Sequence, residues 1–207
     1  MEGIFITFEG PDGAGKSTQI KQVAEKLEKL GIVTLMTREP GGTRLGESIR
    51  GILLDPKQKD LCNEAEILLY AAARAQHVNQ VIRPALEAGK LVLCDRFLDS
   101  SLAYQGFGRD MGLDFVSAIN KYAVREIKPS LTILLDIPPE EGLKRIQTGN
   151  ELDRLESENL GFHRKVRQGF LSLSNNDRDR FVVIDATKSV DIVSKEVWHA
   201  VASFLGG

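Results

Sequence analysis

Residues 4–18 read IFITFEGPDGAGKST, and this stretch decides the fold. Its apolar part, residues 4–8, predicts a strand, and residues 10–17 match the phosphate-binding pattern G-x-x-x-x-G-K-[S/T] in full. Glycine lets the backbone approach a phosphate closely and adopt dihedral angles that a Cβ disfavours. The amides of such a loop form an anion site together with the positive end of the helix that follows. We therefore predict the phosphate loop of a nucleotide-binding domain.

The side chains of this loop have distinct predicted roles. Lys16 is expected to reach the outer phosphates of a bound triphosphate, and the Ser17 hydroxyl to ligate Mg²⁺. The competing interpretation, a glycine-rich turn with a chance lysine, is much weaker because strand, loop and helix agree. The residues of this loop predicted to contact ATP are Gly10, Pro11, Asp12, Gly13, Ala14, Gly15, Lys16, Ser17 and Thr18.

The bulk properties indicate one domain that spans residues 1–207. The chain has 27 basic and 29 acidic side chains and no long basic run, which argues against a nucleic-acid partner. No apolar run is long enough to span a membrane, and the first predicted strand leaves no room for a signal peptide, so we expect a cytoplasmic protein. Cys62 and Cys94 lack metal-ligand spacing and are expected to be small, buried apolar side chains.

Continuous apolar runs predict four further strands, at residues 33–36, 91–94, 131–136 and 181–185. Runs without polar alternation indicate strands buried on both faces, and hence a parallel sheet. Helical periodicity follows the loop, where Leu27 and Leu30 share an apolar stripe, and recurs at residues 46–54, 61–78 and 190–204. Strands that alternate with helices predict a doubly wound α/β domain with a five-stranded parallel sheet flanked by helices.

Polar residues gather where the first three predicted strands end. Asp12 follows the first strand, Arg38 and Glu39 the second, and Asp95 and Arg96 the third. In open α/β sheets, ligands bind outside the carboxyl ends of the strands. A polar residue at the end of a strand can be there only because it faces solvent, so the prediction of a site rests on the whole group rather than on any one residue.

Several arginines near these strand ends predict a second anion site beside the phosphate loop. They are Arg38, Arg50, Arg74 and Arg96. A guanidinium group binds phosphate through a planar fork, although any one of these arginines could instead be a solvated or ion-paired surface residue. Asp95 precedes Arg96, and an aspartate in this place is expected to help hold Mg²⁺ and water.

A nucleobase pocket is predicted from two further segments. Tyr70 and Arg74 are four residues apart on one predicted helix, so they share a face that suits stacking on a base and recognition of its edge. The alternative is a core tyrosine with an exposed arginine. Residues 100–106 supply hydroxyl and amide groups that can read a base and a sugar by hydrogen bonds.

A polar, glycine-containing stretch at residues 148–154 follows Lys144 and Arg145. Such a loop between helices could close over phosphates and expel water before a transfer step, although an ordinary solvated helix hairpin fits its composition equally. We predict a short mobile lid at about residues 146–160.

The chain resembles the family of bacterial thymidylate kinases, P-loop nucleoside monophosphate kinases, nearly from end to end. The resemblance rests on FEGPDGAGKST at residues 8–18, TREPGGT at 37–43, LLYAAAR at 68–74, and DRF at 95–97 with DSSLAYQG at 99–106. It implies a homodimer of the P-loop NTPase fold that transfers the γ-phosphoryl group of ATP to dTMP, with Mg²⁺, to give dTDP and ADP.

Other nucleotide-binding classes fit less well. A deoxynucleoside kinase, or another nucleoside monophosphate kinase of this fold, is the alternative, but a nucleoside acceptor would not need the phosphate-binding Arg38 and Arg96. A GTP-dependent switch needs an N-K-x-D stretch, and residues 120–123 read NKYA within a helical pattern.

The resemblance also implies roles for individual residues. Tyr70 would stack on thymine, Arg74 and Gln105 would hydrogen-bond the base, and Tyr104 would crowd the 2′ position of the sugar. Arg145 would flank adenine. The implied dTMP-binding set is Asp12, Arg38, Glu39, Arg50, Tyr70, Arg74, Arg96, Ser101, Tyr104 and Gln105.

Three positions depart from the common family pattern. Tyr70 replaces a phenylalanine and Phe97 a tyrosine, and both keep an aromatic ring. Gly13 stands where some relatives carry a catalytic arginine in the phosphate loop, and bacterial relatives compensate with arginines in the lid. Because the lid has no arginine between Arg145 and Arg154, Arg154 is our first choice for that role. The predicted catalytic set is then Lys16, Arg96, Arg154 and Asp12, with Ser17 and Asp95 at the metal.

Overall fold

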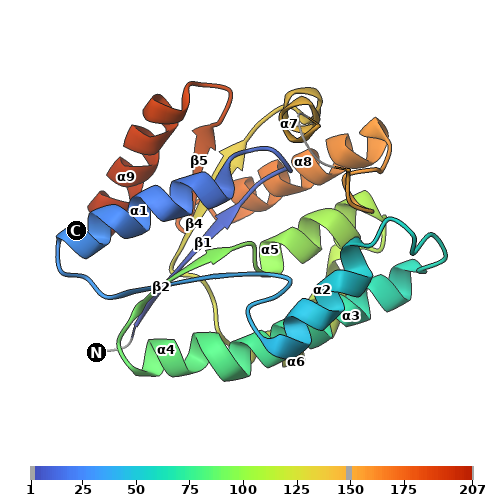
Figure 1. The fold of residues 1–207 in the computed structure, drawn as a ribbon, viewed down its shortest axis with the longest axis horizontal. Coiled ribbons are helices and arrows are strands. Elements are labelled where there is room, and N and C mark those ends of the chain that lie inside the picture. The colour runs from blue at the N-terminus through green and yellow to red at the C-terminus, as the bar shows by residue number, and fades with distance from the viewer. Residues whose placement is uncertain (1–2, 148–150, 207) are drawn as a thin grey trace.

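All five predicted strands form, and they pair in parallel in the order β2-β3-β1-β4-β5. The computed structural model describes residues 3–147 and 151–206, with helices on both faces of this sheet (Figure 1). The strands are β1 (Ile4–Glu9), β2 (Thr34–Arg38), β3 (Leu91–Asp95), β4 (Leu131–Asp136) and β5 (Phe181–Asp185). Each predicted strand agrees with its observed bounds to within one or two residues, which confirms the predicted fold class.

The helices divide between the two faces of the sheet. Those in the chain's first half are α1 (Lys16–Lys29), α2 (Arg44–Leu54), α3 (Asn63–His77), the π-helical turn η1 (Val78–Ile82) and α4 (Arg83–Glu87). The second half adds α5 (Leu98–Ser101), the π-helical turn η2 (Leu102–Gly108), α6 (Leu113–Val124), α7 (Pro139–Ile146), α8 (Leu160–Asn176) and α9 (Val190–Gly206). Within the described residues, no helix is long and apolar enough to cross a membrane.

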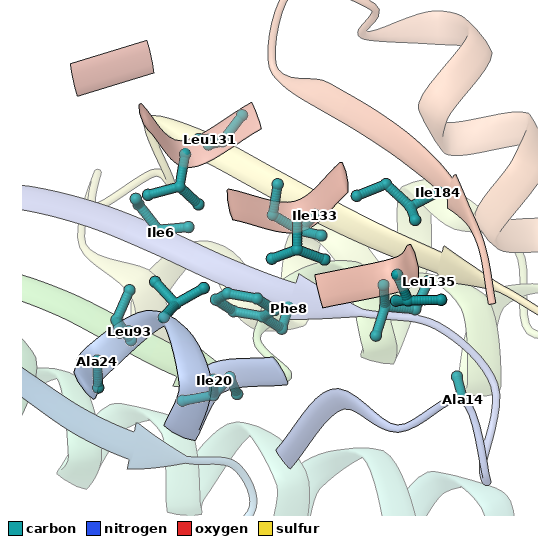
Figure 2. Packing of buried hydrophobic residues seen from close by; sticks show 14 of the residues in the cluster. Ile6, Phe8, Ala14, Ile20, Ala24, Leu93, Leu131, Ile133, Leu135 and Ile184 are labelled. Carbon is teal, nitrogen blue, oxygen red and sulfur yellow. The ribbon is translucent and has the colours of Figure 1, made fainter. Parts of the chain in front are cut away.

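The larger core lies between the sheet and the pair α1 and α9. Ile6 and Phe8 of β1 point into it, together with Ile20 of α1 and residues of β3, β4 and β5 (Figure 2). On the other face, Phe5 of β1 packs with Val92 of β3 and with residues of η1, α4 and α6. This two-sided burial is the reason that the strands are continuous apolar runs in the sequence.

Some predicted core positions are exposed. Leu30 lies just after α1 and is 65% exposed, because Gly31 already turns the chain there with a φ of +75°. Cys94 is buried in β3 as expected, but Cys62 is exposed immediately before α3, so that prediction was wrong for Cys62. The predicted stripe of α9 holds at its centre, where Val197 is buried, while both ends are open to solvent.

Candidate active site

The phosphate loop joins β1 to α1 and curls around the side chain of Lys16. Its ammonium group donates hydrogen bonds to the carbonyls of Gly10 at 3.0 Å and Pro11 at 2.9 Å, and the residue is only 7% exposed. Burial, with a smaller effect of the nearby Arg96 charge, lowers the pKa of Lys16 to about 8. A buried ammonium group at the start of a helix suits a site that receives phosphate oxygens.

A backbone contact explains why position 13 is glycine. Gly13 has a φ of +75°, and a Cβ built there would lie 2.1 Å from the carbonyl oxygen of Gly142 in α7. Gly142 in turn would place a Cβ 2.3 Å from the carbonyl oxygen of Asp12. The loop and α7 therefore pack backbone against backbone, and an arginine at position 13 is incompatible with this packing.

Ser17 and Asp95 meet at the mouth of the loop. The Ser17 hydroxyl donates to Asp95 Oδ2 at 2.6 Å, although the two residues are 78 positions apart in the chain. A hydroxyl beside a carboxylate is an oxygen-only donor pair of the kind that Mg²⁺ prefers, and Mg²⁺ commonly completes its shell with water and substrate phosphates. Among the described residues, no cluster of three or more metal-ligating side chains occurs. The pair thus fits a Mg²⁺ ion that is shared with a bound phosphate.

Arg96 lies between the phosphate loop and the neighbouring cleft. Its guanidinium donates to the Gly10 carbonyl at 3.0 Å, to Asp12 Oδ1 at 2.6 Å and to the Tyr104 hydroxyl at 3.2 Å. The Tyr104 hydroxyl donates to the other Asp12 oxygen at 2.6 Å. Burial disfavours the Asp12 carboxylate, but Arg96, Lys16 and the tyrosine outweigh it and keep the pKa of Asp12 below its usual value. Two predicted site residues, Asp12 and Arg96, are therefore a fixed pair.

Glu9 supports Arg96 from behind, and sequence reasoning missed it. Its carboxylate accepts hydrogen bonds from the Phe97 amide at 2.7 Å and from the Ser100 hydroxyl at 2.6 Å, and Ser100 in turn accepts one from Arg96 at 3.1 Å. Burial, together with the nearby Asp99 carboxylate, raises the pKa of Glu9 to about 7. The sequence does contain a signal for Glu9, because this glutamate ends an apolar strand directly before the phosphate loop.

A cleft with about 630 Å³ of space, part of it open to solvent, lies beside Arg96. Tyr70, Arg74, Ser101, Tyr104 and Gln105 all line it, as predicted for a base pocket. The alternative of an exposed arginine is wrong, because Arg74 is only 2% exposed. The remaining lining residues are Asp12, Glu39, Pro40, Arg50, Leu54, Arg96, Phe97, Ser100, Asp153, Leu155 and Glu156.

Arg74 is fixed by four hydrogen bonds. It donates to Glu39 Oε2 at 2.6 Å, to the Ser101 hydroxyl at 3.0 Å, to the Phe97 carbonyl at 2.9 Å and to the amide oxygen of Asn120. A guanidinium has five N–H groups, so these contacts leave one Nη2 hydrogen without a partner among the described residues.

Glu39 is buried and has more than one partner. Besides Arg74, it contacts His77 Nδ1 at 3.0 Å, and His77 Nε2 lies 2.6 Å from the Thr37 hydroxyl. His77 is fully buried. The end of β2 is thereby joined to α3, behind the base pocket. Nothing in the sequence pattern singled out His77.

A second cleft of about 870 Å³ lies over the phosphate loop. It is lined by Asp12, Gly13, Gly15, Lys16, Ser17, Thr18, Arg38, Glu39, Arg50, Asp95 and Arg96. Asp12, Glu39, Arg50 and Arg96 also line the base cleft, so the two clefts adjoin. Arg38 is half exposed and ion-paired with Glu47 at 2.9 Å, and Arg50 donates to the Pro40 carbonyl at 3.1 Å.

The predicted lid is only partly within the described residues, since residues 148–150 lie outside them. Arg154 donates to the Leu53 carbonyl at 2.8 Å, and its Nη2 lies 2.6 Å from Glu66 Oε2 without the orientation of a hydrogen bond. Within the described part of the chain, Arg154 is not among the residues that line the phosphate cleft. Arg145 lies in the last turn of α7.

Two lid carboxylates that sequence reasoning missed line the base cleft. Asp153 accepts hydrogen bonds from the amides of Leu155 and Glu156 at 2.8 and 2.9 Å, and Glu156 accepts one from the Asp153 amide at 2.9 Å. Burial raises the pKa of both carboxyl groups. The reciprocal pairing of D-x-x-E at residues 153–156 is a capping pattern that was visible in the sequence.

Comparison with known proteins gives one consistent result. A family model for thymidylate kinase matches residues 8–197. A thymidylate kinase of Geobacillus sp. (strain WCH70) is 53% identical over 195 residues, which cover 93% of each chain. A thymidylate kinase of Lactobacillus helveticus is 54% identical over 201 residues, which cover 95% of this chain and 94% of the relative. The crystal structure of thymidylate kinase from Ehrlichia chaffeensis aligns with a TM-score of 0.79 at 33% identity, covering 98% of this chain and 99% of that one.

Proposed function

The chain belongs to the thymidylate kinase family, and we propose that its two joined clefts are where it transfers the γ-phosphoryl group of ATP to dTMP. The observation that carries this proposal is Arg96, which contacts the phosphate-loop carbonyl of Gly10 and lines both clefts. ATP places its phosphates on the loop, and dTMP places its base in the 630 Å³ cleft with its phosphate toward Arg96. The products are dTDP and ADP.

The acceptor is already an anionic phosphate oxygen, so the reaction needs no strong general base. Catalysis comes from in-line positioning of the two phosphates and from neutralisation of the charge on the migrating group. Lys16 serves the donor side, and Arg96 serves the acceptor side. Asp12 positions Arg96 through their 2.6 Å ion pair. Arg38 and Arg50 assist at the acceptor phosphate, and the half-exposed state of Arg38 leaves it free to exchange Glu47 for a ligand.

Mg²⁺ is the proposed cofactor, and Ser17 and Asp95 would hold it. When bound, the ion neutralises charge on the donor phosphates. The 2.6 Å hydrogen bond between the two side chains supports this assignment, because it brings both oxygens to the mouth of the phosphate loop.

Base recognition rests on one donor and one acceptor. The remaining Nη2 hydrogen of Arg74 meets the O4 carbonyl of thymine, and Gln105 meets the neighbouring N3 position. Tyr70 stacks on the ring, and Ser101 lines the same pocket. Tyr104 is held by Asp12 and Arg96 beside the sugar, where it disfavours a 2′ hydroxyl.

The proposed roles of Arg154 and Arg145 concern the lid and the adenine site. Arg154 reaches the migrating phosphoryl group only if its guanidinium leaves Glu66 and the Leu53 carbonyl. Its place between Asp153 and Leu155, which line the base cleft, supports such an exchange when dTMP binds. Arg145, at the end of α7 next to the lid, flanks adenine.

The acceptor assignment is tested with a coupled ADP-release assay over a panel of nucleosides and deoxynucleoside monophosphates. We expect turnover with dTMP and none with thymidine. Turnover with thymidine alone would make the chain a nucleoside kinase, and turnover with a purine monophosphate in preference to dTMP would overturn the base assignment.

The lowered pKa of Lys16 gives a pH dependence with a definite sign. The free enzyme loses the Lys16 charge as the pH rises through about 8, so kcat/KM for ATP should fall above that pH. Bound phosphates stabilise the charged form, so kcat at saturating ATP should not fall in the same range. Steady-state rates between pH 6 and 9.5 test this. A kcat/KM that stays level up to the top of that range would contradict the expectation.

We also propose a homodimer. The adjoining helices α2, α3 and α6 carry exposed apolar side chains, namely Leu45, Ile52, Leu68 and Phe115. Exposed apolar side chains on helices that pack together support a protein–protein interface. Light scattering should give twice the chain mass, and Leu68→Glu should shift it toward the monomer. Leu30→Glu, at a leucine just after α1 that is more exposed than Leu68, should leave the mass unchanged. A monomeric wild-type protein would refute the dimer.

A further inference from the structure

Glu66 is a fully buried carboxylate in the first turn of α3, beside the base cleft but not among the residues that line it. Its Oε1 accepts hydrogen bonds from the Gln105 amide nitrogen at 2.9 Å and from Arg109 Nε at 3.4 Å. Its Oε2 accepts one from Arg109 Nη2 at 3.1 Å and lies 2.6 Å from Arg154 Nη2. Two cations and one amide therefore converge on a single carboxylate.

These partners keep Glu66 ionised. Burial alone would favour the neutral acid, but the hydrogen bonds from Arg109 and Gln105 and the charges of Arg109 and Arg154 keep the pKa of Glu66 below its usual value. An ionised carboxylate can only accept hydrogen bonds. The group of Gln105 that faces Glu66 must therefore be its nitrogen, which settles the orientation of an amide whose two ends are otherwise nearly alike.

The orientation of Gln105 decides what it offers to a base. With the nitrogen turned to Glu66, the carbonyl oxygen of the same planar group is the acceptor available to the cleft that Gln105 lines. Arg74 also lines the cleft, and its remaining Nη2 hydrogen is a donor. This donor–acceptor pair complements the O4 carbonyl and N3–H of thymine or uracil. Cytosine presents the reverse arrangement, an amino group and an unprotonated N3.

We propose that Glu66 is a positioning residue for base selection, which acts by fixing the Gln105 amide so that the site accepts a base with an N3–H and rejects cytosine. This inference rests on the proposed function, because it assumes that the cleft holds the base of dTMP. It assigns to Glu66 a role in specificity through Gln105, since its carboxylate contacts the Gln105 amide but does not itself line the cleft.

Glu66→Gln tests the proposal, because a glutamine side chain can donate and so allows the Gln105 amide to turn over. The readout is the KM for dTMP and the inhibition constant of dCMP as a competitor of dTMP, which needs no turnover of dCMP. We expect the preference for dTMP over dCMP to fall about tenfold or more, since a base hydrogen bond made or lost discriminates at this level. Loss of affinity for both nucleotides by the same factor would indicate a merely structural role and overturn the proposal.

A matched control and a second background make the result specific. Glu158→Gln removes the other partner of Arg109, at 2.5 Å, without touching Gln105, and should leave the dTMP preference unchanged. In a Gln105→Ala background, Glu66→Gln should no longer change the preference, because the group through which it acts is gone. A further fall in the preference for dTMP over dCMP in the Gln105→Ala background would refute the proposal that Glu66 acts through Gln105.

The experiment remains decisive if Glu66→Gln does not fold. Glu66→Asp keeps an acceptor-only charge among the same arginines, and it should keep the dTMP preference even where affinity falls. A loss of preference with aspartate would contradict the proposal. Failure of wild-type protein to phosphorylate dTMP would instead refute the proposed function, so the two failures are distinct.

Discussion

Replacing Lys16 by alanine is expected to lower kcat at saturating ATP and dTMP by about a thousandfold, the scale on which a single charge-stabilising group acts in phosphoryl transfer. Lys16 is the first residue of α1, and its ammonium donates hydrogen bonds to the Gly10 and Pro11 carbonyls. When ATP binds, the donor phosphates would take the place of these carbonyls. Alanine leaves the loop backbone in place but removes the charge. The loss therefore appears in turnover rather than in ATP binding alone.

The same substitution should leave the fold intact. The lowered pKa of Lys16 means that burial disfavours its charge, so removing the side chain takes away an unfavourable group along with its two hydrogen bonds. Thermal unfolding followed by circular dichroism checks this. Lys21→Ala, at an exposed lysine on the same helix, is the matched control and should keep wild-type kcat. A Lys16→Ala protein with near-normal kcat would remove Lys16 from the mechanism.

Replacing Arg96 by alanine is expected to lower kcat/KM for dTMP by about a thousandfold or more, through both binding and turnover. Arg96 contacts the phosphate loop, Asp12, Ser100 and Tyr104. Its loss therefore removes the positive charge proposed for the acceptor phosphate, together with the side chain that lines both clefts. The pKa of Asp12 should then rise toward its ordinary value or above it, because burial remains while the largest opposing charge is gone.

Two companion variants sharpen the Arg96 result. Arg96→Lys keeps a positive charge but loses the planar fork, so it should recover only part of the activity. Arg178→Ala, at an exposed arginine that contacts only Asn175 among the hydrogen bonds of the described residues, should behave as wild type. Full activity of Arg96→Lys would mean that charge alone matters. Unchanged kcat/KM for dTMP in Arg96→Ala would place the acceptor phosphate elsewhere.

The fold could be predicted from the sequence because its strands are buried on both sides. Phe5 and Ile6 point to opposite faces of the sheet and both are buried, so the strand reads as a continuous apolar run with clear ends. Leu30 shows the limit of periodicity. Its spacing matches the apolar stripe of α1, but the helix ends one residue before it.

Lys16, at the end of the loop, and Arg96, after a strand, could be proposed for the candidate site from the sequence because their chemistry and their position in the predicted fold coincide. Residues that act through a partner gave little signal. Glu66 and His77 read as ordinary helix residues, and only the contacts with Gln105 and Glu39, which lie 39 and 38 positions away, reveal what they hold. Glu39 itself, implied as part of the dTMP-binding set, lines the cleft but is buried against Arg74. Long-range partners of this kind are set by tertiary packing and not by local pattern.

The central claim is that one continuous site joins an ATP phosphate loop to a dTMP pocket. Its most direct test uses ATP labelled in the γ-phosphate, Mg²⁺, and either dTMP or thymidine as acceptor, with the labelled products separated by chromatography. We predict label in dTDP when dTMP is supplied, no label in dTMP when thymidine is supplied, and no transfer after the metal is removed with a chelator. Label transferred to thymidine, or no transfer to dTMP, would contradict the claim.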